Sequence, residues 1–222
     1  MALTKFNYNS FDVTPAASTA LAFNSDADGL TTAASGSMVL IKTLTASSDS
    51  TLEFVDGTDD VVLDNTYTTY LFKFYNMHPS GNQTDLTFNM SIDSGSNYNV
   101  AKTTSFFLAT QSEAGSTAFE YNKGFDLAHG TGGQLIAVDT GNANDESNSG
   151  ELWLFNPSST TFVKHFMSKF NSYNGYVVVS YADSHYAAGY GNTTSAVDAV
   201  QFQFDSGTID TGTIKLFGIK DS

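Results

Sequence analysis

The chain has 222 residues, 23 of them acidic and 9 basic, which gives a formal net charge of −14. All the basic residues are lysine, so the bidentate arginine contacts typical of nucleic-acid binding are absent and nucleic acid is not expected as a partner. The absence of cysteine excludes disulfides, thiol catalysis and thiolate zinc sites.

The N-terminal segment has the composition of an arm. Residues 14–37 are rich in Ala, Ser, Thr and Gly, with few large apolar side chains after Phe23. We therefore expect residues 1–37 to form a loop-rich N-terminal arm, with a first strand and a wandering loop as the alternative. No basic region followed by an apolar run opens the chain, and no run of about 18 apolar residues occurs, so neither an export signal nor membrane insertion is predicted.

Residues 38–222 are predicted to form a single domain built from strands. Apolar and polar residues alternate from Leu86 to Ile92 and from Val200 to Phe204, as they do in strands with one buried face. Turn dipeptides such as Asp56-Gly57 and Asn174-Gly175 separate the apolar segments. Strands are expected at 38–45, 51–55, 59–64, 67–77, 86–92, 134–139, 150–155, 161–170, 175–182, 200–204 and 212–219.

Two segments need separate interpretation. In 161–170, Phe162, Phe166 and Phe170 share one face while Val163 and Met167 share the other, so we expect this strand to be covered on both sides. The segment 111–130 fits one short helix or a long loop. Helical periodicity is otherwise weak. The predicted fold is therefore all-β, an antiparallel β-sandwich of jelly-roll type with little helix.

Acidic loops are the first candidate sites. Asn24 to Gly29 resembles the start of an EF-hand calcium loop, with oxygen ligands at alternate positions and glycine at the sixth. The twelfth position is Ser35 instead of a bidentate Glu, so a surface turn is favoured over a loose calcium site. No pair of acidic residues stands out for glycoside cleavage. Surface turns are also favoured for the other acidic loop residues, which are Asp56, Asp59, Asp60, Asp139, Asp145, Glu146 and Glu151.

The histidines show no metal-binding spacing. His78, His129, His165 and His185 form neither an H-x-x-x-H nor an H-E-x-x-H pattern. Asp183-Ser184-His185 contains the residue types of a hydrolase triad, but no G-x-S-x-G motif accompanies it, and a triad depends on geometry rather than on sequence neighbours. We therefore predict no catalytic residue, no metal ligand and no cofactor.

Aromatic side chains fit either sugar stacking or protein packing. Core packing is favoured for Trp153. For the tyrosines, roles at edge strands and interfaces are weighed at least equally with sugar binding: Tyr173, Tyr176, Tyr181, Tyr186 and Tyr190.

Five segments, in this order, resemble a family of structural proteins of marine tailed bacteriophages, including cyanophages. They are SGSMVLIKTLTASSDSTLEFVDG (35–57), LFKFYNMHPSGNQTDLTFNMSIDSGSNYN (71–99), SGELWLFNPSSTTFVKHFM (149–167), AAGYGNTTSAVDAVQFQFDSG (187–207) and GTIKLFGIK (212–220). The resemblance spans most of residues 35–220 and contains strand and turn sequences, with no catalytic signature.

The resemblance implies a non-enzymatic virion protein, on the capsid surface or in the tail and fibre apparatus, that is assembled in the bacterial cytoplasm. We expect a homo-oligomer that contacts other virion proteins, with a trimer as the favoured oligomeric state. The alternative is a receptor-binding fibre protein that recognises a host-surface glycan. A glycan depolymerase ranks third.

Overall fold

The computed structural model describes residues 19–23, 30–34, 37–121, 123–175 and 179–220. All regular elements in these ranges are strands, and every pairing between them is antiparallel. The predicted all-β antiparallel sandwich is therefore confirmed. The strands are β1 (Thr19–Phe23), β2 (Leu30–Ala34), β3 (Met38–Thr45), β4 (Leu52–Val55), β5 (Thr69–Pro79), β6 (Thr84–Ser91), β7 (Lys102–Ser112), β8 (Thr117–Tyr121), β9 (Ala128–Gly130), β10 (Gln134–Thr140), β11 (Asn148–Phe155), β12 (Lys164–Gly175), β13 (Ser180–Gly191), β14 (Ala199–Phe204) and β15 (Ile209–Ile219).

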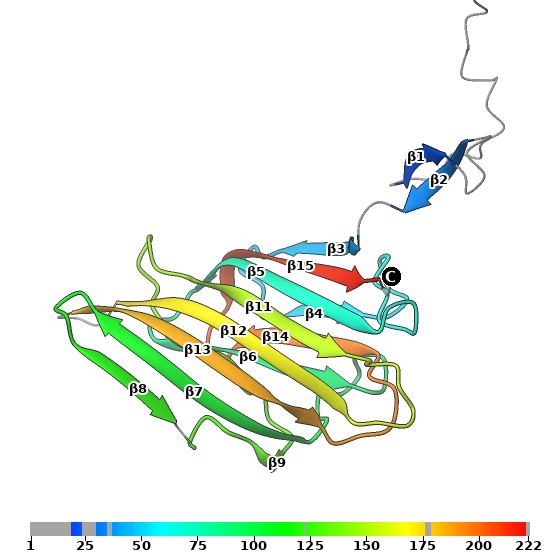
Figure 1. Cartoon of the computed structure of the whole chain (residues 1–222). Coiled ribbons are helices and arrows are strands. Elements are labelled where there is room, and N and C mark those ends of the chain that lie inside the picture. Colours follow the sequence, from blue (N-terminus) through cyan, green and yellow to red (C-terminus); the bar gives the residue numbers. More distant parts are fainter. Residues whose placement is uncertain (1–18, 24–29, 35–36, 122, 176–178, 221–222) are drawn as a thin grey trace, which may run out of the picture.

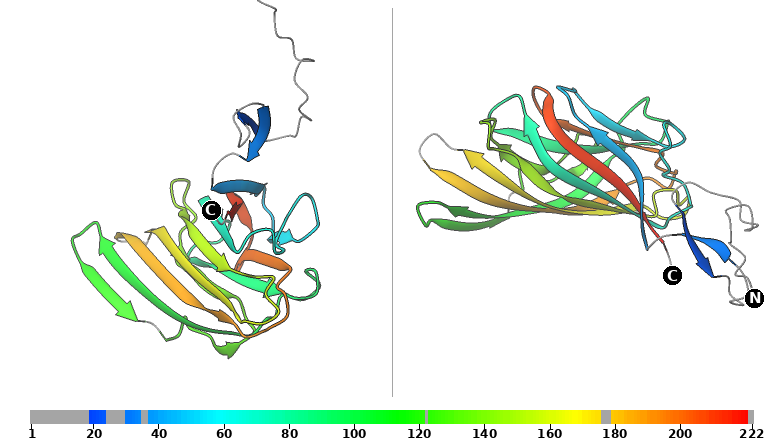
Figure 2. Two further views of the ribbon diagram at one scale, coloured as in Figure 1. Left: turned by 45° about the vertical axis from the view of Figure 1, so that its right-hand side comes forward. Right: turned by 90° about the horizontal axis from the view of Figure 1, so that it is seen from above.

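Two sheets of unequal size face each other (Figures 1 and 2). The small sheet has four strands in the order β10-β6-β14-β4. The large sheet has nine strands, eight of them in the order β3-β15-β5-β11-β12-β13-β7-β8, with β9 paired to β7. In the N-terminal segment, β1 and β2 pair only with each other, and the division of the chain at residue 37 stays a prediction.

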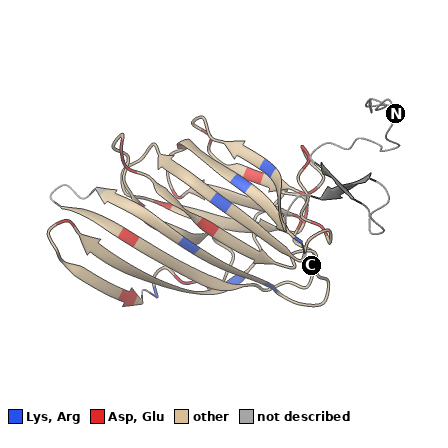
Figure 3. Ribbon diagram, turned by 45° about the horizontal axis from the view of Figure 1, so that its top comes forward, with Lys and Arg blue, Asp and Glu red and all other residues tan. Residues whose placement is uncertain are grey.

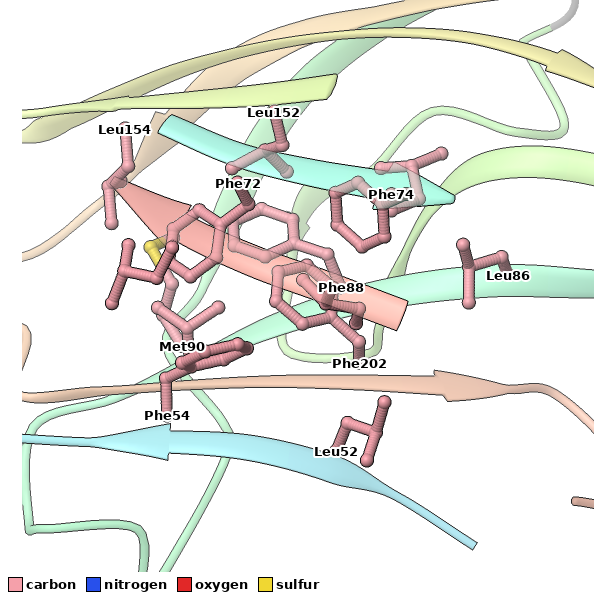
Figure 4. Close-up of a cluster of buried hydrophobic side chains, with 14 of the residues drawn as sticks. Leu52, Phe54, Phe72, Phe74, Leu86, Phe88, Met90, Leu152, Leu154 and Phe202 are labelled. Atoms are coloured by element: carbon pink, nitrogen blue, oxygen red, sulfur yellow. The ribbon is translucent and has the colours of Figure 1, made fainter. Parts of the chain in front are cut away.

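The core between the sheets is dominated by phenylalanine (Figure 4). Phe202 on β14 lies 4.9 Å from Phe74 and 5.3 Å from Phe72, measured between ring centroids, and both partners come from β5 in the large sheet. Phe54 and Phe88 complete the cluster from the small sheet. Strand alternation places these side chains on one face, so burying that face against the opposite sheet provides most of the drive for folding.

The segment 59–64 is a turn region instead of the expected strand. Asp59 and Asp60 have positive φ angles of 49° and 67°, which a strand does not allow. Val61 and Leu63 are buried, as the alternation suggested. The loop is held by a carboxylate, because the backbone N–H of Leu63 donates to Asp56 Oδ1 at 2.8 Å.

The expectation for 161–170 was wrong in its bounds and its coverage. The strand β12 begins at Lys164, and Phe162 precedes it with 68% of its surface exposed. Phe166 and Phe170 are buried, whereas Met167 on the other face is 52% exposed. Only one face of β12 is therefore covered.

The strands next to β12 also differ from the prediction. The expected strand 175–182 is replaced by the end of β12 at Gly175 and the start of β13 at Ser180. The strand β7 was not predicted, and its last residues together with β8 and β9 occupy 111–130, for which a helix or a long loop was expected. The strand β8 has every residue exposed, so it lacks the apolar alternation that marks a strand in sequence.

Candidate functional site

The large sheet extends beyond the small one, and this difference in width creates a cleft on its inner face. The strand β10 ends the small sheet and contacts β12 and β13, while the large sheet continues through β7 and β8. The cleft has a volume of about 280 Å³. Its polar lining includes Glu120, Asp139, Asn174 and Asp183, and its apolar lining includes Leu108, Phe125 and Val138.

The register of the large sheet gathers the polar residues. Asp183 on β13 pairs with Ser172 on β12 and with Thr110 on β7, and Asn174 pairs with Tyr181 one step further along. Residues paired directly across neighbouring strands share one face of a sheet. The inner face is thus apolar near the middle of β12 and β13 and polar towards the end of β12 and the start of β13.

Asp139 enters the cleft from the small sheet through a backbone irregularity. The pairing of β10 with β6 shifts between Ala137 and Thr140, and Asp139 within this bulge has a positive φ of 52°. Its backbone N–H donates to Asp85 Oδ1 at 2.8 Å. Because a bulge reorients the side chain it carries, this local geometry places the carboxylate in the lining of the cleft.

Phe125 is fixed by contacts on both its backbone and its ring. Its carbonyl oxygen accepts a hydrogen bond from Gln134 Nε2 at 3.0 Å, and Gln134 Oε1 accepts one from Thr104 Oγ1 at 2.6 Å. Its ring meets Phe106 edge to face, with centroids 5.2 Å apart. The aromatic wall of the cleft is therefore a held surface.

Two buried acceptors in the cleft have no hydrogen-bond partner. Asn174 Nδ2 donates to Asp183 Oδ2 at 3.2 Å, which leaves Asn174 Oδ1 and Asp183 Oδ1 without donors. Each of these two residues is only 5% exposed. An unsatisfied buried acceptor costs about 1–3 kcal/mol. The arrangement therefore favours a ligand that brings hydrogen-bond donors.

Two carboxylates of the cleft, Asp183 and Asp139, have raised pKa values. Burial raises the pKa of Asp183; the hydrogen bond from Asn174 opposes that rise, and the charge of Asp139 adds to it. Burial also raises the pKa of Asp139, with a further contribution from the charge of Asp205. These groups resist ionisation more than exposed carboxylates do, and a donor or a positive charge in the cleft would offset that cost.

The sequence Asp183-Ser184-His185 does not form a triad. Asp183 and His185 point to the inner face and are buried, while strand alternation turns Ser184 to the opposite face. Both ring nitrogens of His185 lack partners, and burial lowers its pKa to about 4. The imidazole packs beside Phe106 as an uncharged core residue, with ring centroids 5.8 Å apart.

The outer face of the large sheet, turned away from the small sheet, is a second candidate surface. One row of directly paired residues, the central row, crosses eight strands: Thr43, Lys215, Lys73, Glu151, Lys169, Tyr186, Phe107 and Tyr121. Charged residues thus lie at the β15 to β12 part of the row (Figure 3). Aromatic residues lie at the β13 to β8 part. Three lysines against one glutamate make this row locally basic in a chain with a net charge of −14.

Large apolar side chains are exposed on the same outer face. Six of them are between 43% and 73% exposed: Met38, Leu40, Tyr75, Phe119, Tyr121 and Met167. Lys169 Nζ lies 5.8 Å from the ring centroid of Tyr186, and the Tyr186 ring stacks on Phe107 with an interplanar angle of 10°. Both neighbours in the row thus contact Tyr186, which leaves its ring poorly placed to stack on a sugar.

Trp153 lies on the outer face, which corrects the expectation of core packing. It is partly buried and lines a shallow groove with Met167 and Lys169. Its Nε1 donates to Glu151 Oε1 at 3.2 Å. Tyr173, Tyr186 and Tyr190 are also partly buried on β12 and β13, while Tyr176 lies outside the described residues.

The remaining predicted residues are dispersed. The calcium-like loop 24–29 and Ser35 lie outside the described residues. Glu146 Oε2 accepts from the backbone N–H of Ala143 at 2.7 Å, which is a loop contact, and His78 Nε2 lies 3.1 Å from the Ala143 carbonyl oxygen. His165 contacts Tyr190, and His129 pairs with Asn192. Within the part of the chain that the structure covers, no three His, Asp or Glu side chains are placed to hold a metal ion.

Sequence reasoning named Asp139, Asp183 and Tyr181 but did not join them, and it missed Glu120, Asn174 and Phe125. For Asn174 the sequence signal is polarity at alternate positions near the end of β12, and Glu120 and Phe125 carry no such signal. The described elements include no helix long and apolar enough to cross a membrane.

Comparison with protein-family models, curated proteins and solved structures found no match for this chain.

Proposed function

We propose that this chain is a non-enzymatic structural protein of a tailed-bacteriophage virion, on the capsid surface or in the tail apparatus. It assembles as a homo-oligomer, with a trimer as the expected state, and contacts other virion proteins. The observation that carries this proposal is the outer face of the large sheet, where the described residues form a broad surface of exposed apolar side chains with lysines among them. The sequence resemblance described above supports the virion setting.

The strand order supports a jelly-roll assignment. In a jelly roll, eight strands form two sheets in which strands 1-8-3-6 and 2-7-4-5 are neighbours, an architecture used by capsid and lectin domains. Here β3-β15-β5-β11 and β4-β14-β6-β10 are neighbours. They have these same places in chain order when the separate pair β1 and β2 and the five other strands of the large sheet are set aside. We infer that β7, β8, β9, β12 and β13 are insertions that widen one sheet of a jelly roll.

The outer face is large enough for a specific protein contact. Eight strands spaced about 4.8 Å apart span roughly 34 Å, and about eight residues along each strand span roughly 26 Å. The resulting area of roughly 900 Å² is close to the share, about 800 Å², that one partner buries in a standard interface. Its lysines fit the acidic surface that the remainder of a −14 chain offers, so a neighbouring copy is the partner we propose for this face.

Light scattering coupled to size-exclusion chromatography tests the oligomer. Met167→Glu places a charge in the middle of the outer face, and Ile92→Glu places one at a side chain exposed to a similar degree after β6. We expect Met167→Glu to shift the wild-type oligomer towards monomer and Ile92→Glu to leave it unchanged. A wild-type chain that is monomeric at high concentration and in high salt contradicts the oligomer.

The virion role needs its own measurement. Mass spectrometry of purified phage particles that encode this chain is expected to detect it, and reconstruction of the particle is expected to show the outer face in contact with protein. A chain missing from mature particles contradicts the virion proposal.

A further inference from the structure

The cleft beside β10 has a feature that the proposed structural role does not explain. Its wall carries two oxygen acceptors, Asn174 Oδ1 and Asp183 Oδ1, that are buried and have no donor. The hydrogen bond between the two side chains uses the other atoms, namely Asn174 Nδ2 and Asp183 Oδ2. The two free acceptors therefore belong to one fixed pair. A ligand that donates two neighbouring hydrogen bonds would satisfy both.

The size and lining of the cleft select among ligands that donate hydrogen bonds. A calcium ion requires six to eight oxygen ligands at short distance, and the described residues contain no group of three acidic or histidine side chains suited to a metal. A metal ion or a simple ammonium group would also leave most of the roughly 280 Å³ unfilled. The lining combines polar side chains with the apolar side chains of Leu108, Phe125 and Val138, so the ligand needs both hydroxyl groups and an apolar surface.

We propose that this cleft binds one hexopyranose unit of a glycan, with vicinal hydroxyl groups donating to Asp183 Oδ1 and Asn174 Oδ1. The C–H surface of the sugar ring lies against Phe125 and Leu108, which form the apolar part of the lining. Asp139, directed into the lining by the β10 bulge, accepts from a further hydroxyl. The site belongs to the inserted strands and β10, so it is separate from the contacts proposed on the outer face.

Ligand-observed saturation-transfer NMR provides the binding assay. The probes are the methyl glycosides of glucose, galactose, mannose and N-acetylglucosamine, each tested with the full chain. We expect at least one to bind with a dissociation constant on the order of 1 mM, as is typical of a ligand of this size. Absence of binding by all four at roughly 50 mM overturns the proposal.

Two variants connect binding to the cleft. Asp183→Asn can still accept the bond from Asn174 but turns the free acceptor into a donor, so we expect binding to weaken at least about tenfold. Thr110→Trp fills the cleft and should abolish binding, whereas Ala109→Trp, one residue away on the opposite face of β7, should retain it. Circular dichroism establishes that each variant is folded, and Asp183→Asn decides the matter if Thr110→Trp does not fold.

Competition by cations completes the test. Calcium chloride and spermidine are added separately to the protein with its bound glycoside. We expect neither to displace the sugar. Displacement by either one, or unchanged sugar binding in both Asp183→Asn and folded Thr110→Trp, overturns the assignment of the cleft to a hexopyranose.

Discussion

Replacing His185 by leucine should change how stability depends on pH. Burial lowers the pKa of His185 from 6.5 to about 4, so between these values the unfolded chain binds a proton that the folded chain does not. Folding stability that depends on this group is therefore lost as the pH falls from about 6.5 towards 4. The difference of about 2.5 pKa units corresponds to at most about 3 kcal/mol.

The comparison between wild type and His185→Leu isolates this effect. Asp85 acts in the opposite direction, because burial raises its pKa to about 6 and the folded state then gains stability as the pH falls. Asp85 is present in both proteins, so its contribution cancels in the difference. At about pH 7.5, His185→Leu should be more stable by about 1–2 kcal/mol, since two unpartnered ring nitrogens are removed from the core.

Urea unfolding followed by far-UV circular dichroism measures the difference at about pH 7.5 and about pH 4.5. We expect the advantage of His185→Leu to grow by about 2 kcal/mol at the lower pH. His165→Leu, on the exposed face of β12, controls for the loss of one imidazole. An advantage that stays the same within about 0.5 kcal/mol at both pH values would refute the reasoning.

Three further substitutions test the packing and the buried charges. Gly150→Ala should lower the free energy of unfolding by about 2–4 kcal/mol, because the added Cβ would lie 2.4 Å from a backbone carbonyl oxygen and 2.5 Å from a phenylalanine ring. Urea denaturation measures the change, and Gly132→Ala is the control, because no atom lies within 4 Å of a Cβ added there. Phe202→Ala should lower the free energy of unfolding by about 3–5 kcal/mol in the same assay, because Phe202 is buried in the core. Phe162→Ala should lower it by less than about 1 kcal/mol, because Phe162 is exposed, and equal losses would contradict the placement of Phe202 in the core. Burial lowers the pKa of Lys102 to about 8, so wild type should gain stability relative to Lys102→Met between about pH 8 and 10, and a constant difference would contradict this.

The strands of the inferred jelly roll were all anticipated from sequence. Each of β3, β4, β5, β6, β10, β11, β14 and β15 overlaps an expected strand. These strands bury one face in the phenylalanine core, so apolar residues recur at every second position and the period is visible. The one false strand, 59–64, had buried Val61 and Leu63 at the same spacing, but backbone turns at Asp59 and Asp60 place them there instead.

The strands β7, β8, β9, β12 and β13, which we infer to be insertions, were predicted poorly for a related reason. On β7, adjacent Phe106 and Phe107 point to opposite faces, one into the small second cluster and one onto the outer face, so no single apolar period appears. On β13, Asp183 and His185 are buried where an apolar residue is expected. Polar residues on an inner face obscure the pattern that sequence reading depends on.

The errors and the candidate sites therefore have a common cause. A strand that only completes a core can follow strict alternation, but a strand that lines a cleft must carry polar groups inward, as Asp183 and Asn174 do. A strand that offers a contact surface must likewise carry apolar groups outward, as Met167 and Phe119 do. Both departures cost stability in the isolated chain, through unsatisfied acceptors in one case and exposed apolar area in the other. The unpaired acceptors of the cleft, Asn174 Oδ1 and Asp183 Oδ1, lie on β12 and β13, which is the reason to assign the proposed ligand site to the widened part of the sheet. The exposed apolar side chains extend from β8 and β12 to β5 and β3, so the proposed contact surface spans the whole large sheet.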